Sequence, residues 1–289
     1  MQPEPMGRNF DHIVIAGHDL AAVTDFYRRI GFQVGRRNIH PWGTENHIIQ
    51  FDGVFLELIG LPPAGRVLTD PAPYFANFIR NYLAKREGLA MLVLASKDAK
   101  SDYEDFKARD IGLGDLFDFA RQARTADGKD IHVAFTLAFA HPNVSMDCGF
   151  FTCQQHYPEN FWNSVFQVHS NGVITLYEVI FASDRPEIHR SFLADFIGSE
   201  VIRAENEIIV FGNDRQRTII AHPDRLMRDY GIKIETAQMH MVALSFSVRN
   251  IAHFKLQLQS QCVAYSIFAD KVVIAAETAF GAFLVFAQI

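Results

Sequence analysis

The sequence has few cysteines, and their arrangement excludes a disulfide framework. The three cysteines, Cys148, Cys153 and Cys262, are odd in number and do not follow a repeated CxxC spacing of the kind that binds zinc. We therefore interpret them as reduced thiols, which favours a cytoplasmic protein.

Long apolar runs and an excess of basic charge are also missing. No stretch approaches the roughly 20 apolar residues that a membrane-spanning helix requires. The N-terminal residues MQPEPMGRN lack the apolar stretch of a signal peptide. The 27 Lys and Arg are scattered and are outnumbered by 33 Asp and Glu, which gives a net charge of −6. These features predict no membrane span and no nucleic-acid partner.

What the sequence does contain is typical of a globular protein with a large core. Its 289 residues are enough for two domains, and 49% of them are hydrophobic while 21% are charged. Phenylalanine is abundant, with 26 residues, which indicates an aromatic core or an apolar pocket.

Residues 10–60 predict one strand-helix-three-strand unit. The apolar run 10–16 is rich in β-branched residues and too short for a free-standing helix. Asp19 can cap a following helix, which Gly31 can end. Asp52-Gly53 is a hairpin signal between two apolar runs. The three strand-like runs after the helix are 32–34 and onward, 47–51 and 54–59.

Two polar residues stand in the apolar strands of this unit, His12 in the first and Glu57 in the last. A buried carboxylate is costly unless it is paired or bound to a cation. Histidine and glutamate are also ligands of Zn, Fe, Mn and Ni. Two other interpretations are a simple His–Glu pair and a glutamate on the solvent face of a half-exposed strand.

The strings FDHIVIAGHDL, FYRRIGF, FLELIG and RNIHPWGTENHIIQF together resemble the vicinal oxygen chelate superfamily, and in particular its glyoxalase-like proteins. This superfamily includes glyoxalases, extradiol dioxygenases and bleomycin-resistance proteins. Its βαβββ module carries one metal ligand on the first strand and another on the last. The resemblance therefore implies that His12 and Glu57 bind a divalent metal (Zn, Fe, Mn or Ni) and that the substrate is a small molecule.

The same order of elements recurs from Gly88, Val173 and near Met239, with Asp98 and Asp184 in the place of the first capping aspartate. We therefore predict an α+β protein of four βαβββ modules, in two halves with curled mixed sheets and helices packed outside. The predicted halves are residues 10–155, which carry the site, and 173–289, which are degenerate. A further helix is predicted from Thr69-Asp70-Pro71, and a turn at Asp127-Gly128.

The second module lacks an obvious pair of ligands. The alignment places Met91 where His12 stands and Cys153 near the position of Glu57. Because a thioether suits soft metals, Met91 is a poor replacement. A third ligand must then come from Cys153, Gln155 or His156. His156 has the better chemistry and Gln155 the better strand register.

The loop HPWGTENH, residues 40–47, and the linker near residue 169 are the predicted substrate-binding segments. The linker strings QH-x-PE and H-x-NG resemble those of glyoxalase-like proteins, although Asn171-Gly172 can also be a plain turn. Thr and Asn in the loop can equally satisfy their own backbone. His47 is a candidate general base, because its pKa is near neutral. The predicted substrate-binding residues are His40, Trp42, Thr44, Asn46 and His169.

Two arginines upstream of this loop, Arg36 and Arg37, can hold an anionic group or lie in solvent.

Three functions remain open. The leading one is a metal-dependent enzyme, an isomerase, lyase or dioxygenase, acting on a small carbonyl or vicinal-oxygen compound. The alternative is a metal-free binding or resistance protein of the same fold, and the third is a scaffold. A homodimer is compatible with each.

Overall fold

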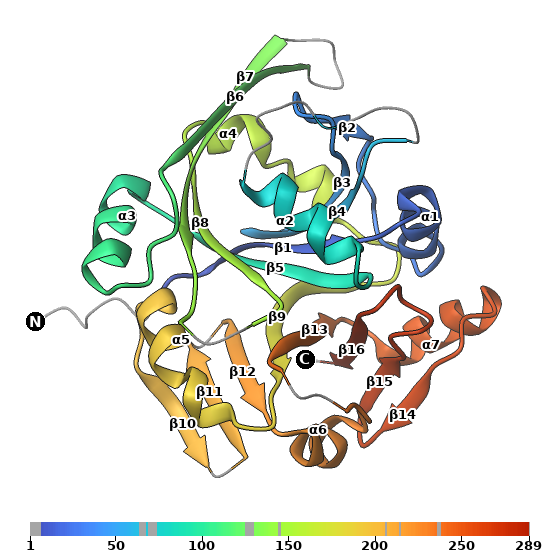
Figure 1. Cartoon of the computed structure of the whole chain (residues 1–289). Coiled ribbons are helices and arrows are strands. Elements are labelled where there is room, and N and C mark those ends of the chain that lie inside the picture. The colour runs from blue at the N-terminus through green and yellow to red at the C-terminus, as the bar shows by residue number, and fades with distance from the viewer. Residues whose placement is uncertain are drawn as a thin grey trace, which may run out of the picture.

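The computed structural model contains two eight-stranded mixed sheets, one in each half of the chain (Figure 1). The structure describes residues 7–63, 68, 74–124, 130–143, 146–205, 207–213, 215–235 and 238–288. The predicted helix start at Thr69-Asp70-Pro71 and the predicted turn at Asp127-Gly128 lie outside these ranges. Within them, no helix is both long and apolar enough to cross a membrane.

The first sheet has the strand order β2-β3-β4-β1-β5-β8-β7-β6. Its strands are β1 (Phe10–Ala16), β2 (Asn38–Ile39), β3 (Glu45–Phe51), β4 (Val54–Gly60), β5 (Gly88–Ala95), β6 (Phe117–Arg124), β7 (Asp130–Ala140) and β8 (Gly149–Gln155). The helices of this half are α1 (Leu20–Arg29), α2 (Tyr74–Leu83) and α3 (Ala99–Ala108). The linker to the second half contains α4 (Pro158–Phe161) and the 3-10 turn η1 (Ser164–Gln167).

The second sheet repeats this order as β10-β11-β12-β9-β13-β16-β15-β14. Its strands are β9 (Val173–Ala182), β10 (Val201–Glu205), β11 (Ile208–Gly212), β12 (Arg217–Ala221), β13 (His240–Val248), β14 (Ser266–Phe268), β15 (Lys271–Ile274) and β16 (Phe283–Gln288). Its helical segments are η2 (Pro186–His189), α5 (Arg190–Ile197), α6 (Pro223–Tyr230) and α7 (Ile251–Ser260).

Each sheet is built from two βαβββ modules joined at their first strands. In the first sheet β1 is parallel to β4 and antiparallel to β5, and in the second β9 is parallel to β12 and antiparallel to β13. The predicted α+β class with four modules and two halves is therefore confirmed. The strand predicted from 32–34 and onward begins later than expected, because residues 32–37 are irregular and the short β2 begins only at Asn38.

Polar caps start three of the module helices. The carboxylates of Asp19 and Asp98 accept hydrogen bonds from backbone N–H groups of α1 and α3, and the Asn250 side chain does the same for α7. The predicted cap at Asp184 is wrong. A 3-10 turn intervenes there, and α5 begins at Arg190 without a side-chain cap.

Helix α2 is an exception to the placement of helices outside the sheets. In Figure 1 it lies inside the curl of the first sheet, and its Phe75 and Ile79 line a cavity there. The curled sheet has a concave face that its own strands do not cover. Helix α2 fills part of the space on that face.

The largest hydrophobic core joins the two halves. Phe32 and Phe51 of the first half pack on Phe246 of the second, with ring centroids 5.5 and 5.8 Å apart, and Phe246 stacks on Phe286 at 5.3 Å. All four side chains are buried. The outer faces of the two sheets thus share one core, and the inner face of the first sheet is left for a site.

Candidate functional site

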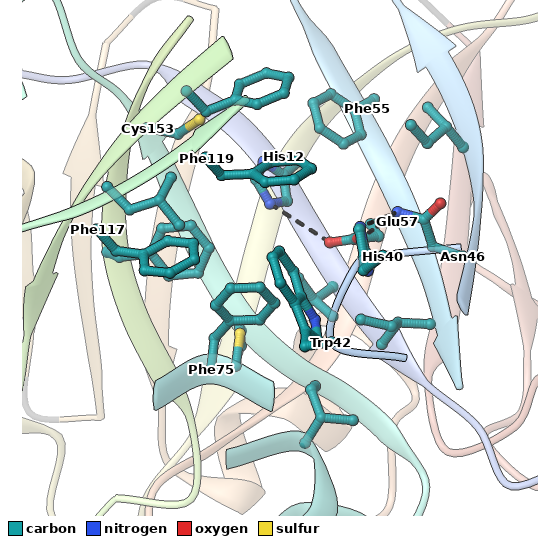
Figure 2. Close-up of a pocket in the computed structure, with 18 of the residues that line it drawn as sticks. His12, His40, Trp42, Asn46, Phe55, Glu57, Phe75, Phe117, Phe119 and Cys153 are labelled. Atoms are coloured by element: carbon teal, nitrogen blue, oxygen red, sulfur yellow. Dashed lines mark hydrogen bonds and ion pairs between the residues drawn. The ribbon is translucent and has the colours of Figure 1, made fainter. Parts of the chain in front are cut away.

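A cavity of about 100 Å³ lies on the concave face of the first sheet (Figure 2). It adjoins an outer, more polar cavity of about 530 Å³, and the two share Ile48, Arg121 and Phe161 as a common wall. Aromatic rings make a large part of the inner wall. They belong to Trp42, Phe55, Phe75, Phe117, Phe119, Phe135, Phe151 and Phe161.

Strand alternation decides which side chains reach this cavity. His12 and Val14 of β1 face it, while Ile13 and Ile15 point to the shared core on the other face. On β4, Phe55, Glu57 and Ile59 face it in the same way. The two predicted metal ligands therefore lie on one face of the sheet.

A β-bulge puts Asp11 beside His12. The pairing of β1 with β5 shifts by one residue between Phe10 and His12, so Asp11 is the extra residue. Its Oδ1 lies 2.6 Å from Nδ1 of His12, and Asp11 is only 4% exposed. Because a carboxylate oxygen accepts, the proton lies on Nδ1, and the lone pair of Nε2 faces the cavity.

Glu57 lies opposite that lone pair. Its Oε2 is 3.7 Å from Nε2 of His12, which is longer than a hydrogen bond, and its Oε1 accepts a 2.5 Å hydrogen bond from Asn46 Nδ2. Donor atoms about 3–4 Å apart suit two ligands of one ion with bonds of ~2.0–2.2 Å. The ring of His12 stacks on Phe55 at 4.4 Å, which holds its orientation.

The 40–47 loop supplies a second polar group at the same wall. Trp42 Nε1 donates to the buried Thr44 hydroxyl at 2.7 Å, and that hydroxyl also lies 2.8 Å from His40 Nδ1. His40 Nε2 is 3.3 Å from Asn46 Nδ2 and 3.9 Å from Glu57 Oε1. His40, Trp42 and Asn46 line the cavity, and Thr44 positions His40 and Trp42.

Burial lowers the pKa of His40, and the nearby Arg121 lowers it further, while the negative charge of Glu57 raises it. The net shift is downward, so His40 is neutral near pH 7 and able to accept a proton.

His47, the predicted general base, is not brought into the cavity. It follows Asn46 on β3 and therefore points to the opposite side of the strand, where its Nδ1 lies 2.8 Å from the Gly35 carbonyl oxygen. Because side chains alternate along a strand, the residue next to the cavity-facing Asn46 points away from the cavity.

Gln155 and His156 do not reach the cavity wall either. Gln155 Nε2 donates to Asp11 Oδ2 at 2.7 Å, so Gln155 supports the aspartate that orients His12. His156 Nε2 lies 2.7 Å from the Thr136 hydroxyl, which itself donates to Asp118. The structure thus gives Gln155 an indirect link to His12 and gives His156 none.

The sheet register also changes the expected equivalents in the second module. His12 is paired with Phe55 on β4, and Met91 is paired with Gly149 on β8, so Phe151 rather than Cys153 corresponds to Glu57. Met91, Phe151 and Cys153 all line the cavity. Burial raises the pKa of the Cys153 thiol well above its usual value, which keeps the sulfur protonated. Neither counterpart of the ligand pair is therefore a hard donor.

Elsewhere, a triad of metal-compatible side chains occurs once among the described residues, at Glu207, His222 and Asp224 near the surface of the second half. Glu207 pairs there with Arg228.

In the second half the counterpart of His12 is Glu178, which is buried and bonded to Tyr230, Ser245 and Arg217. In the second half, the side chain that corresponds to His12 is therefore fully engaged by contacts within the protein.

His169, predicted to bind substrate, lies outside the cavity and joins the linker to the first half. Its Nδ1 accepts from the Gln33 backbone N–H at 3.0 Å, and Nε2 donates to the Gln50 carbonyl at 3.0 Å. Burial lowers the pKa of His169 to about 4. Both ring nitrogens are used within the protein.

Acid is therefore expected to destabilise the fold through His169. Its pKa is about 4 in the folded state and near 6.5 when unfolded, so the unfolded chain binds the proton first as pH falls. This residue's contribution is intact above pH 6.5, and about 2–3 kcal/mol of it is lost by pH 4. Urea unfolding of wild type and His169→Gln across this range measures the effect. Parallel pH curves for the two proteins would contradict it.

Arg121 is a cavity residue that the sequence interpretation missed. It follows Phe117 and Phe119 on the inward face of β6 and is the one Lys or Arg among the described residues that line the inner cavity. Neither a hydrogen bond nor an ion pair joins its guanidinium to another described residue. The inward alternation of Phe117, Phe119 and Arg121 was a signal that could have found it.

Of the two arginines considered, Arg37 pairs with Glu45, and Arg36 lines only the outer cavity.

The chain was compared with known families and structures. A family model described as "Glyoxalase-like domain" matches residues 10–197. No curated protein matches. A hypothetical protein from Staphylococcus aureus is similar in structure, with a TM-score of 0.69 at 12% identity, over 97% of this chain and 99% of the other.

Two enzyme structures share the fold. A triple mutant of 4-hydroxymandelate synthase from Streptomyces coelicolor has a TM-score of 0.62 at 10% identity, over 98% of this chain and 93% of its own. A fusion of a xylose isomerase-like TIM barrel with 4-hydroxyphenylpyruvate dioxygenase has a TM-score of 0.55 at 11% identity, over 100% of this chain and 51% of its own. The chain has the fold of the vicinal oxygen chelate proteins and belongs to the glyoxalase-like domain family.

Proposed function

We propose that this protein is a divalent-metal-dependent enzyme that acts on a small carbonyl or vicinal-oxygen compound. The observation that carries the proposal is the pair formed by His12 Nε2 and Glu57 Oε2, 3.7 Å apart at the wall of an aromatic cavity. Asp11 holds the ring of His12 from behind, as carboxylates do for metal-bound histidines.

These residues fit a divalent metal by their chemistry. His12 and Glu57 would hold it through two protein donors, and substrate oxygens or water would complete the coordination, because none of the third donors considered, Cys153, Gln155 and His156, joins the pair. When bound, such an ion acts as a Lewis acid toward a carbonyl group. The metal-free binding protein is the less favoured function, because an apolar binding pocket gives no reason to orient a histidine with a buried aspartate.

The polar residues of the loop have separate roles in this proposal. His40, kept neutral by burial, accepts or returns a proton at Nε2 on the cavity side. Asn46 fixes Oε1 of Glu57, so that Oε2 remains directed at His12. The rings around the cavity exclude water and bind the apolar part of the substrate. This moves the base role from His47 to His40.

Reconstitution with metal tests the proposal. Protein treated with chelator, then dialysed against Fe²⁺, Mn²⁺, Zn²⁺ or Ni²⁺, is expected to retain about one ion per chain. Stoichiometry is measured by elemental analysis, and the loaded protein is then assayed for loss of 2-oxo acids and for hemithioacetal isomerisation. No retention of any of the four metals would contradict the metal-enzyme proposal and favour the binding protein.

Asp11→Asn is expected to weaken metal binding about 10- to 100-fold, because it removes the acceptor that fixes the His12 tautomer. Asp25→Asn is the matched control, since Asp25 lies on the exposed side of α1 and pairs only with Arg28 among the described residues. Calorimetric titration of both variants with the retained metal measures the difference. Equal affinities would show that Asp11 has no part in the site.

A further inference from the structure

Within the part of the chain that the structure describes, Arg121 is a cation without a partner, and it lies beside the aromatic rings of the cavity. Its side chain is half-buried, and burial lowers the pKa of its guanidinium, which records the cost of the charge without a partner. Among the described residues it has no hydrogen bond and no ion pair. Arg8, another half-buried arginine, does have a partner in Asp102.

Arg121 lines both cavities and lies near the polar residues of the inner one. It lines the inner cavity beside Phe119 and also lines the outer one. Its charge acts on His40, whose Nε2 lies 3.9 Å from Glu57. A ligand in the inner cavity therefore has both the guanidinium and the His12–Glu57 pair in the wall around it.

We infer that Arg121 binds the carboxylate of the substrate, and that the substrate is a monoanionic carboxylic acid with an aromatic or bulky apolar body. This deepens the proposed function and rests on the same cavity being the ligand site. The guanidinium presents parallel N–H donors that match the two oxygens of a carboxylate. The surrounding rings match an apolar body.

The charge of the site favours one negative charge over two. Arg121 contributes one positive charge, while Asp11 and Glu57 are acidic groups close to the same cavity. A monoanion matches the single charge of the guanidinium and meets about half the repulsion from these two carboxylates that a phosphate dianion meets. The inference is therefore a carboxylate rather than a phosphate ester.

Binding of three matched probes to metal-free protein tests this inference. The probes are 3-phenylpropionate, its uncharged amide and phenyl phosphate. Both tryptophans of the chain report on the site, since Trp42 lines the cavity and Trp162 packs on Phe55 at 5.9 Å. Intrinsic fluorescence then gives each dissociation constant. The wild type is expected to bind the acid more tightly than the amide and the phosphate.

Arg121→Gln is expected to weaken binding of the acid about 10- to 100-fold and to leave the amide within about twofold, because only the charged contact is lost. Arg28→Gln, on the exposed side of α1, is the matched control and should change neither. Equal affinity of wild type for acid and amide, tighter binding of the phosphate, an equal loss for both probes in Arg121→Gln, or no binding of any probe would each overturn the inference. Because metal is absent throughout, metal stoichiometry reports separately on the proposed function.

Discussion

Glu57→Gln and His12→Gln are each expected to abolish stoichiometric metal binding and, with it, catalysis. Each variant removes one of two protein ligands, so the loss of affinity should exceed the ~10–100-fold that follows the loss of an outer partner. Glu57→Gln keeps the shape of the side chain and an oxygen that can accept from Asn46, so the hydrogen bond at 2.5 Å has a replacement. Elemental analysis after dialysis, with thermal unfolding of the same samples, measures both metal and fold.

His47→Gln is the matched control for these variants. It lies on β3 beside Asn46 but faces away from the cavity, and glutamine can still donate to the Gly35 carbonyl. It should retain the metal and the activity. If His47→Gln lost metal while His12→Gln kept it, the ligand assignment would be wrong, and so would the role of strand alternation in this site.

Phe246→Ala is expected to cost about 3–5 kcal/mol of unfolding free energy, the range for a fully buried phenylalanine. Its ring has no exposed surface and contacts Phe32, Phe51 and Phe286, so truncation opens a void where the two halves meet. Urea unfolding followed by tryptophan fluorescence and by far-UV circular dichroism measures the change.

Leu256→Ala is the control for that experiment. It lies on the outer side of α7 and is 65% exposed, so its effect should stay within about 0.5 kcal/mol. Because the core is shared, both probes should report one transition in the wild type. Two separate transitions would instead indicate that residues 10–155 and 173–289 unfold as independent domains, and Phe246→Ala would then affect the second alone.

The sequence by itself determined the fold class and the strand-level placement of His12 and Glu57. Local signals sufficed for this, because apolar runs, Asp-Gly turns and the caps at Asp19 and Asp98 act within a few residues. The structure then showed that β1 and β4 are parallel neighbours whose alternation puts both side chains on one face. The resemblance to glyoxalase-like proteins added the expectation that these two residues bind a metal.

Tertiary structure alone decided which polar residues join that pair. A one-residue bulge beside His12 brought in Asp11, and one position of alternation exchanged His47 for Asn46 at the cavity. Such offsets come from pairing between strands distant in sequence, and one residue of register reverses the face of a side chain. The positions of Gln155 and Arg121 depend on such pairing as well. Their strands, β8 and β6, are distant from β1 in the sequence, and the curled sheet brings them to the first module.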